Sequence, residues 1–478
     1  MAESSPRQDL CAGPVLVFNG WRPGRTSLAA LVVRPEGAEP GPLSAAGGEV
    51  PPERLAMAGG LTAWRYLFDL PDDRMASYAL EGQRYEVAAD LTGDLRIGYV
   101  SCNGEEHGDI RRDPGERNAM WCRLAEEHGV APLNLLLHGG DQIYADEVTQ
   151  AHALTRGWPD DVPLHPDGAT LRGAREALRA AFFRRYTALY ALPGFADLAA
   201  RVPSLAMWDD HDICDGWGSL PGGVCDSEAG QVLFGAAREA FLVFQQGAAP
   251  DRLPDGAGGG STLGRRADLP GLSVLAPDLR SERRRDRIMG PQGWRRFENW
   301  LSGGDLPRRV LLMSSVPLLG PRLSLLERVM LLTNRMEKYE DDLRDQWQSR
   351  AHRREWQRML KEVLAIHETG KTRITALSGE IHLATHATMA ARGAPVHQLV
   401  ASGIAHRAPP REWAWVLDAL ARFGEAPLPE HPVRLHALPG RRGIYTAERN
   451  FLLLERHGDE WRAAWELEKS GRTGWLPI

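Results

Sequence analysis

Four short segments of the sequence concentrate side chains that bind metals or transfer protons, and each follows an apolar run. They are VSCNG (100–104), HGGDQIYADE (138–147), MWDDHDICDGW (207–217) and LSGEIHLATH (377–386). Side chains just past the carboxyl ends of strands in an α/β sheet converge on one crevice, so residues distant in sequence can share a site. The common position therefore predicts one site that combines thiol, phenol, imidazole and carboxylate groups.

Asp141 and Tyr144 follow the apolar run LNLLL and two glycines. A carboxylate with two oxygens can bridge two cations, and a tyrosinate is a strong hard ligand for ferric iron. The alternative is a turn in which Asp141 caps the next segment and Tyr144 packs in the core. Cys102 is a further candidate ligand because it also follows a strand-like run, although a single buried cysteine is more often inert.

The segment 207–217 carries a dense group of acids, Asp209, Asp210, Asp212 and Asp215, around His211. Four carboxylates beside an apolar run are unfavourable unless cations or hydrogen-bond donors neutralise them. A histidine flanked by carboxylates suits a general acid, since a neighbouring aspartate raises its pKa and fixes its orientation. The alternative is a solvated loop whose aspartates cap the next helix.

Glu380 and His382 are two residues apart, so in an extended segment they face the same way and could bind one metal. His386, four residues on, would pair with His382 on a helix. The helical zinc-protease motif needs a glutamate after its first histidine, however, and Leu383 stands there. The alternative for both histidines is a core position bonded to a backbone carbonyl.

The elements that must position these residues change character near residue 94. Short strand-like runs separated by Gly/Pro turns occur at 15–18, 27–33, 64–70 and 85–88, with a possible helix at 52–57. We therefore predict a small all-β domain over 1–93, of the sandwich type.

From residue 94 to 478, apolar runs alternate with helical patterns, which indicates a layered α/β domain. Strands are predicted at 95–100, 133–137, 204–207, 310–313, 374–377 and 398–401, and helices at 116–128 (ended by Gly129), 171–192, 229–246, 293–301 and 350–367. The runs 451–455 and 461–467 predict a hairpin, and the Gly/Pro-rich stretch at about 247–268 predicts an exposed loop.

Composition narrows the class of protein. A chain of 478 residues exceeds the usual size of one core, and its formal charge of −6 requires neither nucleic acid nor an anionic membrane as a partner. Five cysteines, an odd number without CxxC spacing, favour a reducing compartment. Because we find neither a signal peptide nor a long apolar run, we expect a soluble, cytoplasmic protein.

The ordered set SC, GDxIYxD, WDDHD, DLRS, DQW and SGxIH resembles the PhoD-like (alkaline phosphatase D) family of binuclear metallophosphoesterases. The resemblance covers most of the chain and implies a layered α/β/β/α sandwich with an N-terminal β domain. It implies a first metal site of ferric type and a second metal that is calcium or another divalent cation. By resemblance, the first is held by Cys102, Asp141, Tyr144 and His382, and the second by Asp210 and Glu380, with Asp141 bridging.

The same resemblance suggests roles for residues around the metals. His211 would sit beside the leaving group, oriented by Asp212. Arg280, in the position of the family's DxR motif, would contact the substrate phosphate, with a surface ion pair as the alternative; Asp345 matches the family's DxW as an outer or direct ligand. The family usually has Asp where this chain has Glu380, so the geometry of the second metal is less certain to be kept.

These patterns predict metal-dependent hydrolysis of phosphate esters, monoesters or diesters, by a hydroxide that two metals generate. A catalytically inactive scaffold or ligand-binding protein with the same fold is one alternative. The His211-Asp212 dipeptide also allows a helical HD-type phosphohydrolase, provided that residues 204–208 form a helix rather than a strand.

Overall fold

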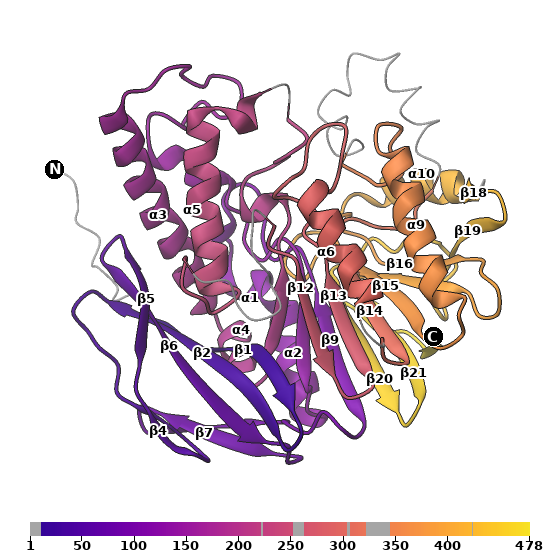
Figure 1. The fold of residues 1–478 in the computed structure, drawn as a ribbon, viewed down its shortest axis with the longest axis horizontal. Coiled ribbons are helices and arrows are strands. Elements are labelled where there is room, and N and C mark those ends of the chain that lie inside the picture. The colour runs from indigo at the N-terminus through magenta and orange to yellow at the C-terminus, as the bar shows by residue number, and fades with distance from the viewer. Residues whose placement is uncertain (1–10, 221–222, 252–261, 304–305, 322–344, 423) are drawn as a thin grey trace.

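The computed structural model describes residues 11–220, 223–251, 262–303, 306–321, 345–422 and 424–478 (Figure 1). Two large sheets pack against each other and helices cover their outer faces, which gives the predicted α/β/β/α layers. Within the described residues, no helix is both long and apolar enough to span a bilayer.

The first large sheet has at its centre three parallel strands, β9 (Leu95–Val100), β10 (Leu135–Gly139) and β11 (Ser204–Met207). Every residue of these three strands is buried, as expected for parallel strands that are covered on both faces. The helical HD-type alternative is wrong, because it requires a helix at residues 204–208, and residues 204–207 form the buried strand β11. The predicted C-terminal hairpin is confirmed as β20 (Asn450–His457) and β21 (Glu460–Leu467). Its strand β20 pairs with β9, so the hairpin extends the first sheet.

The second large sheet contains the parallel strands β13 (Leu272–Ala276), β14 (Arg309–Ser314), β15 (Arg373–Ser378) and β17 (Val396–Val400). Four antiparallel strands complete it: β12 (Arg265–Leu269), β16 (Thr385–Met389), β19 (His431–His436) and β18 (Glu425–Leu428). One cluster of buried apolar side chains includes Ile97 of β9, Leu205 of β11 and Val310 of β14, so it joins the two sheets.

Helices cover the outer faces of both sheets. On one side lie α2 (Ala119–Val130), α3 (Gly168–Tyr190), α4 (Phe195–Ala199) and α5 (Glu228–Phe244), and on the other α6 (Pro291–Ser302), α9 (Arg353–His367) and α10 (Arg411–Ala421). The side chains of Asp167 and Ser227 cap the N-termini of α3 and α5, and such caps satisfy backbone N–H groups that the first helical turn leaves unpaired.

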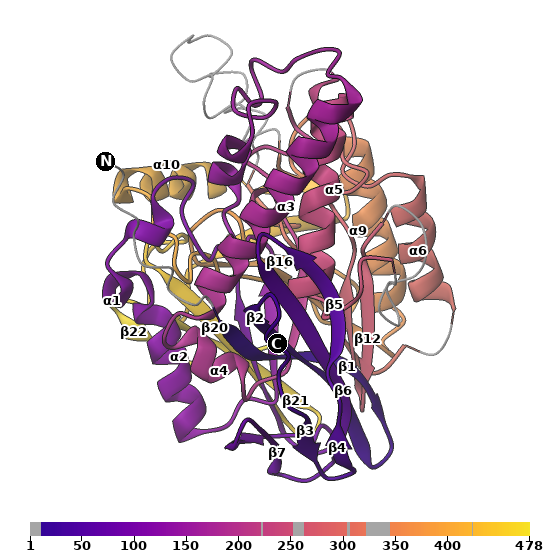
Figure 2. The ribbon, with the colours of Figure 1, turned by 90° about the vertical axis from the view of Figure 1, so that its left-hand side faces the viewer.

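The predicted all-β region at the N-terminus is confirmed, and it is sandwich-like. The strands β1 (Ala12–Arg22), β2 (Arg25–Pro35), β6 (Leu61–Pro71) and β5 (Glu53–Ala58) pack against a four-stranded sheet of β4 (Gly48–Val50), β3 (Leu43–Ala45), β7 (Ala76–Leu80) and β8 (Gln83–Val87). In Figure 2 these strands lie below α3 and α5. Because β1 also pairs with β11, the first large sheet runs across residue 93, and the domain boundary there stays a prediction.

Three predicted elements differ from the structure. Residues 53–58 form strand β5 instead of a helix because they pair with β6. The helix predicted at 116–128 is divided at Asn118 into α1 (Pro114–Arg117) and α2, and α2 continues past Gly129 to Val130. The predicted loop at 247–268 overlaps β12, where Ala267 is buried; residues 252–261 lie outside the described residues.

Candidate metal centre

The ends of β9, β10 and β15 bring four predicted ligands together in two close pairs. The Sγ of Cys102 lies 3.4 Å from Oδ2 of Asp141, and the phenol oxygen of Tyr144 lies 3.0 Å from Nε2 of His382, 238 positions later in the chain. Cys102, Asp141 and Tyr144 are at most 1% exposed. The strand ends thus bring these side chains together in pairs, and their role as ligands of one metal centre stays a prediction.

The backbone at these strand ends has an unusual conformation. Cys102, Asp141, Glu380 and His382 have positive φ values of 55°, 55°, 66° and 54°, and the other non-glycine residue of this kind in the described part of the chain is Glu81. This region is unfavourable for side chains with a Cβ, and residues held there cluster at functional sites. Four of the six predicted metal ligands therefore occupy strained turns.

The carboxylate of Asp212 holds the turn that carries Asp141. It accepts hydrogen bonds from the backbone N–H groups of Asp141 (3.0 Å), Ile143 (3.3 Å) and Asp209 (2.9 Å), and from the side-chain amide of Gln245 (2.7 Å). The predicted role of Asp212 in orienting His211 is corrected, because its oxygens point at this backbone and away from the imidazole.

His211 is oriented by Asp146. Its Nδ1 lies 3.0 and 3.1 Å from the two carboxylate oxygens of Asp146, and its ring stacks on that of Tyr144 with centroids 4.2 Å apart. Burial lowers the pKa of His211, but the carboxylates of Asp146 and Asp210 outweigh it and raise the pKa well above its ordinary value. The raised pKa favours the protonated ring, which is the form that a general acid needs.

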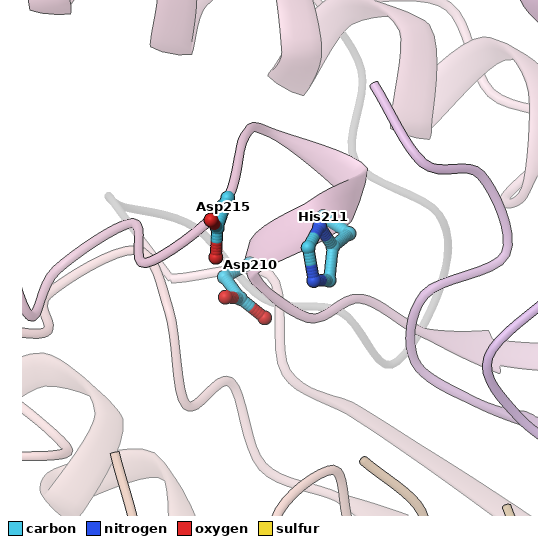
Figure 3. A group of neighbouring side chains, drawn as sticks. All are labelled: Asp210, His211 and Asp215. Atoms are coloured by element: carbon cyan, nitrogen blue, oxygen red, sulfur yellow. The ribbon is translucent and has the colours of Figure 1, made fainter. Parts of the chain in front are cut away.

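Two groups of neighbouring side chains in the described chain could each hold a cation. Ligand atoms of Asp141, Asp209 and Asp210 lie within 4.8 Å of one another, and so do those of Asp210, His211 and Asp215, which Figure 3 shows beside the turn after β11. Asp210 belongs to both groups, which between them contain Asp209, Asp210 and Asp215 of the acidic cluster predicted from the sequence but not Asp212.

The donor atoms themselves fit a metal. Oδ1 of Asp141 and Oδ2 of Asp209 are buried and have no hydrogen-bond partner among the described residues. Burial, followed by the charge of Asp209, raises the pKa of Asp141, and burial together with Asp141 raises the pKa of the Cys102 thiol. Acids that are buried without enough donors are stabilised as anions when a cation binds.

Arg280 lies behind the carboxylates. Its side chain is 0% exposed, it pairs with Asp209 and Asp345, and its Nη2 lies 3.4 Å from Oδ1 of Asp210. The surface ion pair considered from the sequence is therefore wrong, since nothing of Arg280 reaches solvent. Burial raises the pKa of Asp345, but the charges of Arg280 and Arg283 outweigh it and lower the pKa below its ordinary range.

Glu380 and His386 have different surroundings. The carboxylate of Glu380 accepts a hydrogen bond of 2.7 Å from the amide of Gln346, on the same turn as His382, and its place at a second metal stays a prediction. His386 lies in β16, where its Nε2 is 3.1 Å from Nδ1 of His397. It is a core histidine, as the alternative held, but its partner is a second imidazole instead of a carbonyl.

Two residues of the site were missed from the sequence. Asp146 lies inside the segment 138–147 and could have been chosen as the partner of His211. His406 stacks on His382 with ring centroids 3.4 Å apart. It follows β17, so the strand-end argument would have found it if the segment after residue 401 had been included.

Known proteins resemble this chain in sequence and in fold. Residues 106–339 match a family model described as PhoD related phosphatase. The uncharacterized protein YGR266W of Saccharomyces cerevisiae is 26% identical over 398 residues, or 67% of this chain. That match spans 55% of the yeast protein, so the chain corresponds to about half of its length.

Among solved structures, PhoD matches all of this chain and 90% of its own with a TM-score of 0.57 and 12% identity, which shows a common fold. A dimetal phosphatase from Danio rerio matches 80% of this chain and 98% of its own, with a TM-score of 0.32 and 10% identity. The resemblance predicted from the sequence is confirmed to this extent: residues 106–339 are similar to PhoD related phosphatases, and the whole chain has the PhoD fold.

Proposed function

We propose that this protein hydrolyses phosphate esters at a two-metal centre formed by Cys102, Asp141, Tyr144, Asp210, Glu380 and His382. The observation that carries the proposal is the meeting of a thiol, a carboxylate, a phenol and an imidazole from three strand ends, at Cys102–Asp141 and Tyr144–His382 distances of 3.4 and 3.0 Å. A purely structural core has no need of such groups, three of which (Cys102, Asp141 and His382) have a strained backbone.

The donor set divides into two unlike sites. Cys102, Tyr144 and His382 supply sulfur, phenol oxygen and nitrogen, which suit a transition ion such as Fe(III), whereas Asp210 and Glu380 supply oxygen, which suits Ca²⁺ or another hard cation. Asp141 has one carboxylate oxygen for each. When bound, the two cations would acidify a water molecule and neutralise the charge of the phosphate.

The side chains around the metals divide the remaining work. His211, held by Asp146 and stacked on Tyr144, protonates the departing oxygen of the substrate. Arg280 and Asp212 keep the carboxylates and their backbone in place. This assigns Arg280 a positioning role, because it is buried behind the carboxylates. A reducing, cytoplasmic setting is part of the proposal, since Cys102 binds metal only as a free thiolate.

The experiment pairs metal analysis with turnover. Purified protein is assayed for bound metals and for hydrolysis of an aryl phosphate monoester and an aryl diester, together with the Asp141→Asn variant and the exposed control Asp286→Asn. We expect the wild type and the control to bind metals and hydrolyse at least one ester, and Asp141→Asn to lose both properties, because an amide bridges two cations poorly. Full metal content and turnover in Asp141→Asn would refute the ligand assignment.

The same experiment decides the alternative of an inactive scaffold or ligand-binding protein. Such a protein would hydrolyse neither ester even after it is loaded with Fe(III), Mn²⁺ or Ca²⁺. The preference between monoester and diester is read directly from the two rates.

A further inference from the structure

The ring of His406 lies almost flat on the ring of His382. The two centroids are 3.4 Å apart and the planes are inclined by 13°, while the ring of Tyr144 lies 5.5 Å from that of His406. The side chain of His406 is 15% exposed, so it borders the site without belonging to the predicted ligand set.

The backbone of His406 is tied to the turn that carries Cys102. The N–H groups of His406 and Ala405 donate to the carbonyl oxygen of Cys102 at 3.1 and 3.3 Å, and the guanidinium of Arg112 donates to the carbonyl of Ala405 at 2.9 Å. The segment that follows β17 is thereby fixed against the end of β9.

Both nitrogens of the His406 ring are also engaged. Nδ1 lies 2.7 Å from the carbonyl oxygen of Arg407, to which it donates, and Nε2 faces Oε1 of Glu106 at 3.6 Å. Arg407 in turn pairs with Glu105 at 3.0 Å. With both edges and its backbone held, the ring has one orientation, in which its face covers His382.

We propose that His406 is a positioning residue that fixes the ring plane of His382, so that Nε2 of His382 points at the oxygen of Tyr144, and that Glu106 holds His406 in this role. The stacked ring removes rotational freedom that His382 would otherwise lose when it binds a metal. Groups of this kind around a ligand commonly change metal affinity by roughly 10–100-fold. The inference rests on the proposed metal centre, because His382 must be a ligand for its orientation to matter.

The test measures metal binding without turnover. The metal-depleted 478-residue chain is titrated with Co²⁺, and the near-ultraviolet absorption of a cobalt–thiolate bond reports occupancy of the site that contains Cys102. The Cys102→Ser variant defines the background, and His457→Ala, at the exposed C-terminal end of β20, is the matched control. The variants are His406→Ala, His406→Phe and Glu106→Gln, each first checked for an unchanged thermal unfolding midpoint without metal.

We expect His406→Ala to weaken Co²⁺ binding by roughly 10–100-fold, and His406→Phe to restore most of the affinity because a phenyl ring can stack in the same way. Glu106→Gln should fall between the wild type and His406→Ala. Unchanged affinity in His406→Ala, or equal losses in the Ala and Phe variants, would overturn the positioning role. A wild type without any Cys102-dependent absorption would instead overturn the proposed metal centre, so the two failures are distinguishable.

Discussion

The carboxylate of Asp212 accepts a hydrogen bond of 3.0 Å from the backbone N–H of Asp141, 71 positions earlier in the chain. The same carboxylate binds the backbone N–H of Asp209, so one buried side chain joins the turns after β10 and β11. Asp212 thus holds the backbones of the two carboxylates with orphaned oxygens, and Oδ1 of Asp141 and Oδ2 of Asp209 are left to meet a cation.

The Asp212→Asn substitution tests this connection. An amide presents a donor to backbone N–H groups that are themselves donors, so we expect a loss of about 1–3 kcal/mol in the free energy of unfolding and weaker metal binding. Urea unfolding of the metal-free protein measures the first effect and metal titration the second. Asp286→Asn, at an exposed position, should match the wild type. An Asp212→Asn protein with normal stability and metal affinity would show that Asp141 does not depend on Asp212.

The His211–Asp146 pair predicts a pH dependence. The charge of Asp146 is the largest influence that raises the pKa of His211, and a raised pKa keeps the acid protonated to higher pH. In Asp146→Asn, activity should therefore decline at lower pH than in the wild type, and the pH profile of kcat against aryl phosphates measures the shift.

The His211→Ala variant tests the acid itself. It should keep its metals but lose rate, on the order of 100-fold or more for poor leaving groups and least for activated ones, which leave without a proton. Rates measured over a series of aryl phosphates separate the cases. An equal loss for all leaving groups would contradict the acid role.

A substitution of Arg280 tests whether this residue stabilises the fold or binds the substrate phosphate. Its guanidinium neutralises Asp209 and Asp345 in the interior, and removal of one partner of a buried pair commonly costs about 3–5 kcal/mol. We expect Arg280→Met to lower the free energy of unfolding by that amount in the metal-free protein. A stable Arg280→Met protein with only a raised KM would instead favour direct contact with the substrate phosphate.

The pair of histidines in β16 and β17 predicts acid sensitivity away from the site. Burial, followed by the charges of His397 and His436, lowers the pKa of His386 to about 3. Burial, followed by the charge of Arg309, lowers the pKa of His397 to about 4. Since the unfolded chain takes up protons near pH 6.5, these groups stabilise the fold above that pH, and the stabilisation is lost as the pH falls toward their folded values.

For His386 alone, the loss between pH 7 and pH 5 is roughly 2 kcal/mol. Urea unfolding of the wild type and of His386→Gln at both pH values measures it. The variant should lose less stability than the wild type on acidification, and parallel losses would exclude His386 as the source.

Much of the fold could be predicted because buried parallel strands give continuous apolar runs, as in residues 95–100 and 204–207, which became β9 and β11. The β5 strand was missed because its pairing with β6 is a tertiary contact that overrides local preference. The antiparallel strand β12 was missed for the same reason, because residues 265–269 form a strand through their pairing with β13.

The candidate site was predictable to the level of residue type at the strand ends. The hydrogen-bond partner of each carboxylate was not predictable. Spacing alone cannot show that Asp146 contacts His211, whereas Asp212 accepts hydrogen bonds from backbone N–H groups. The stacking of His406 on His382 depends on the relative placement of two loops, which no local pattern encodes.

The left-handed backbone at Cys102, Asp141, Glu380 and His382 destabilises the fold at the same four residues that supply proposed metal ligands. Glycine would relax each turn, by something on the order of 1–3 kcal/mol, and would delete a donor atom with every gain. A programme of thermostabilisation guided by backbone geometry would thus choose these positions early and remove the proposed metal ligands.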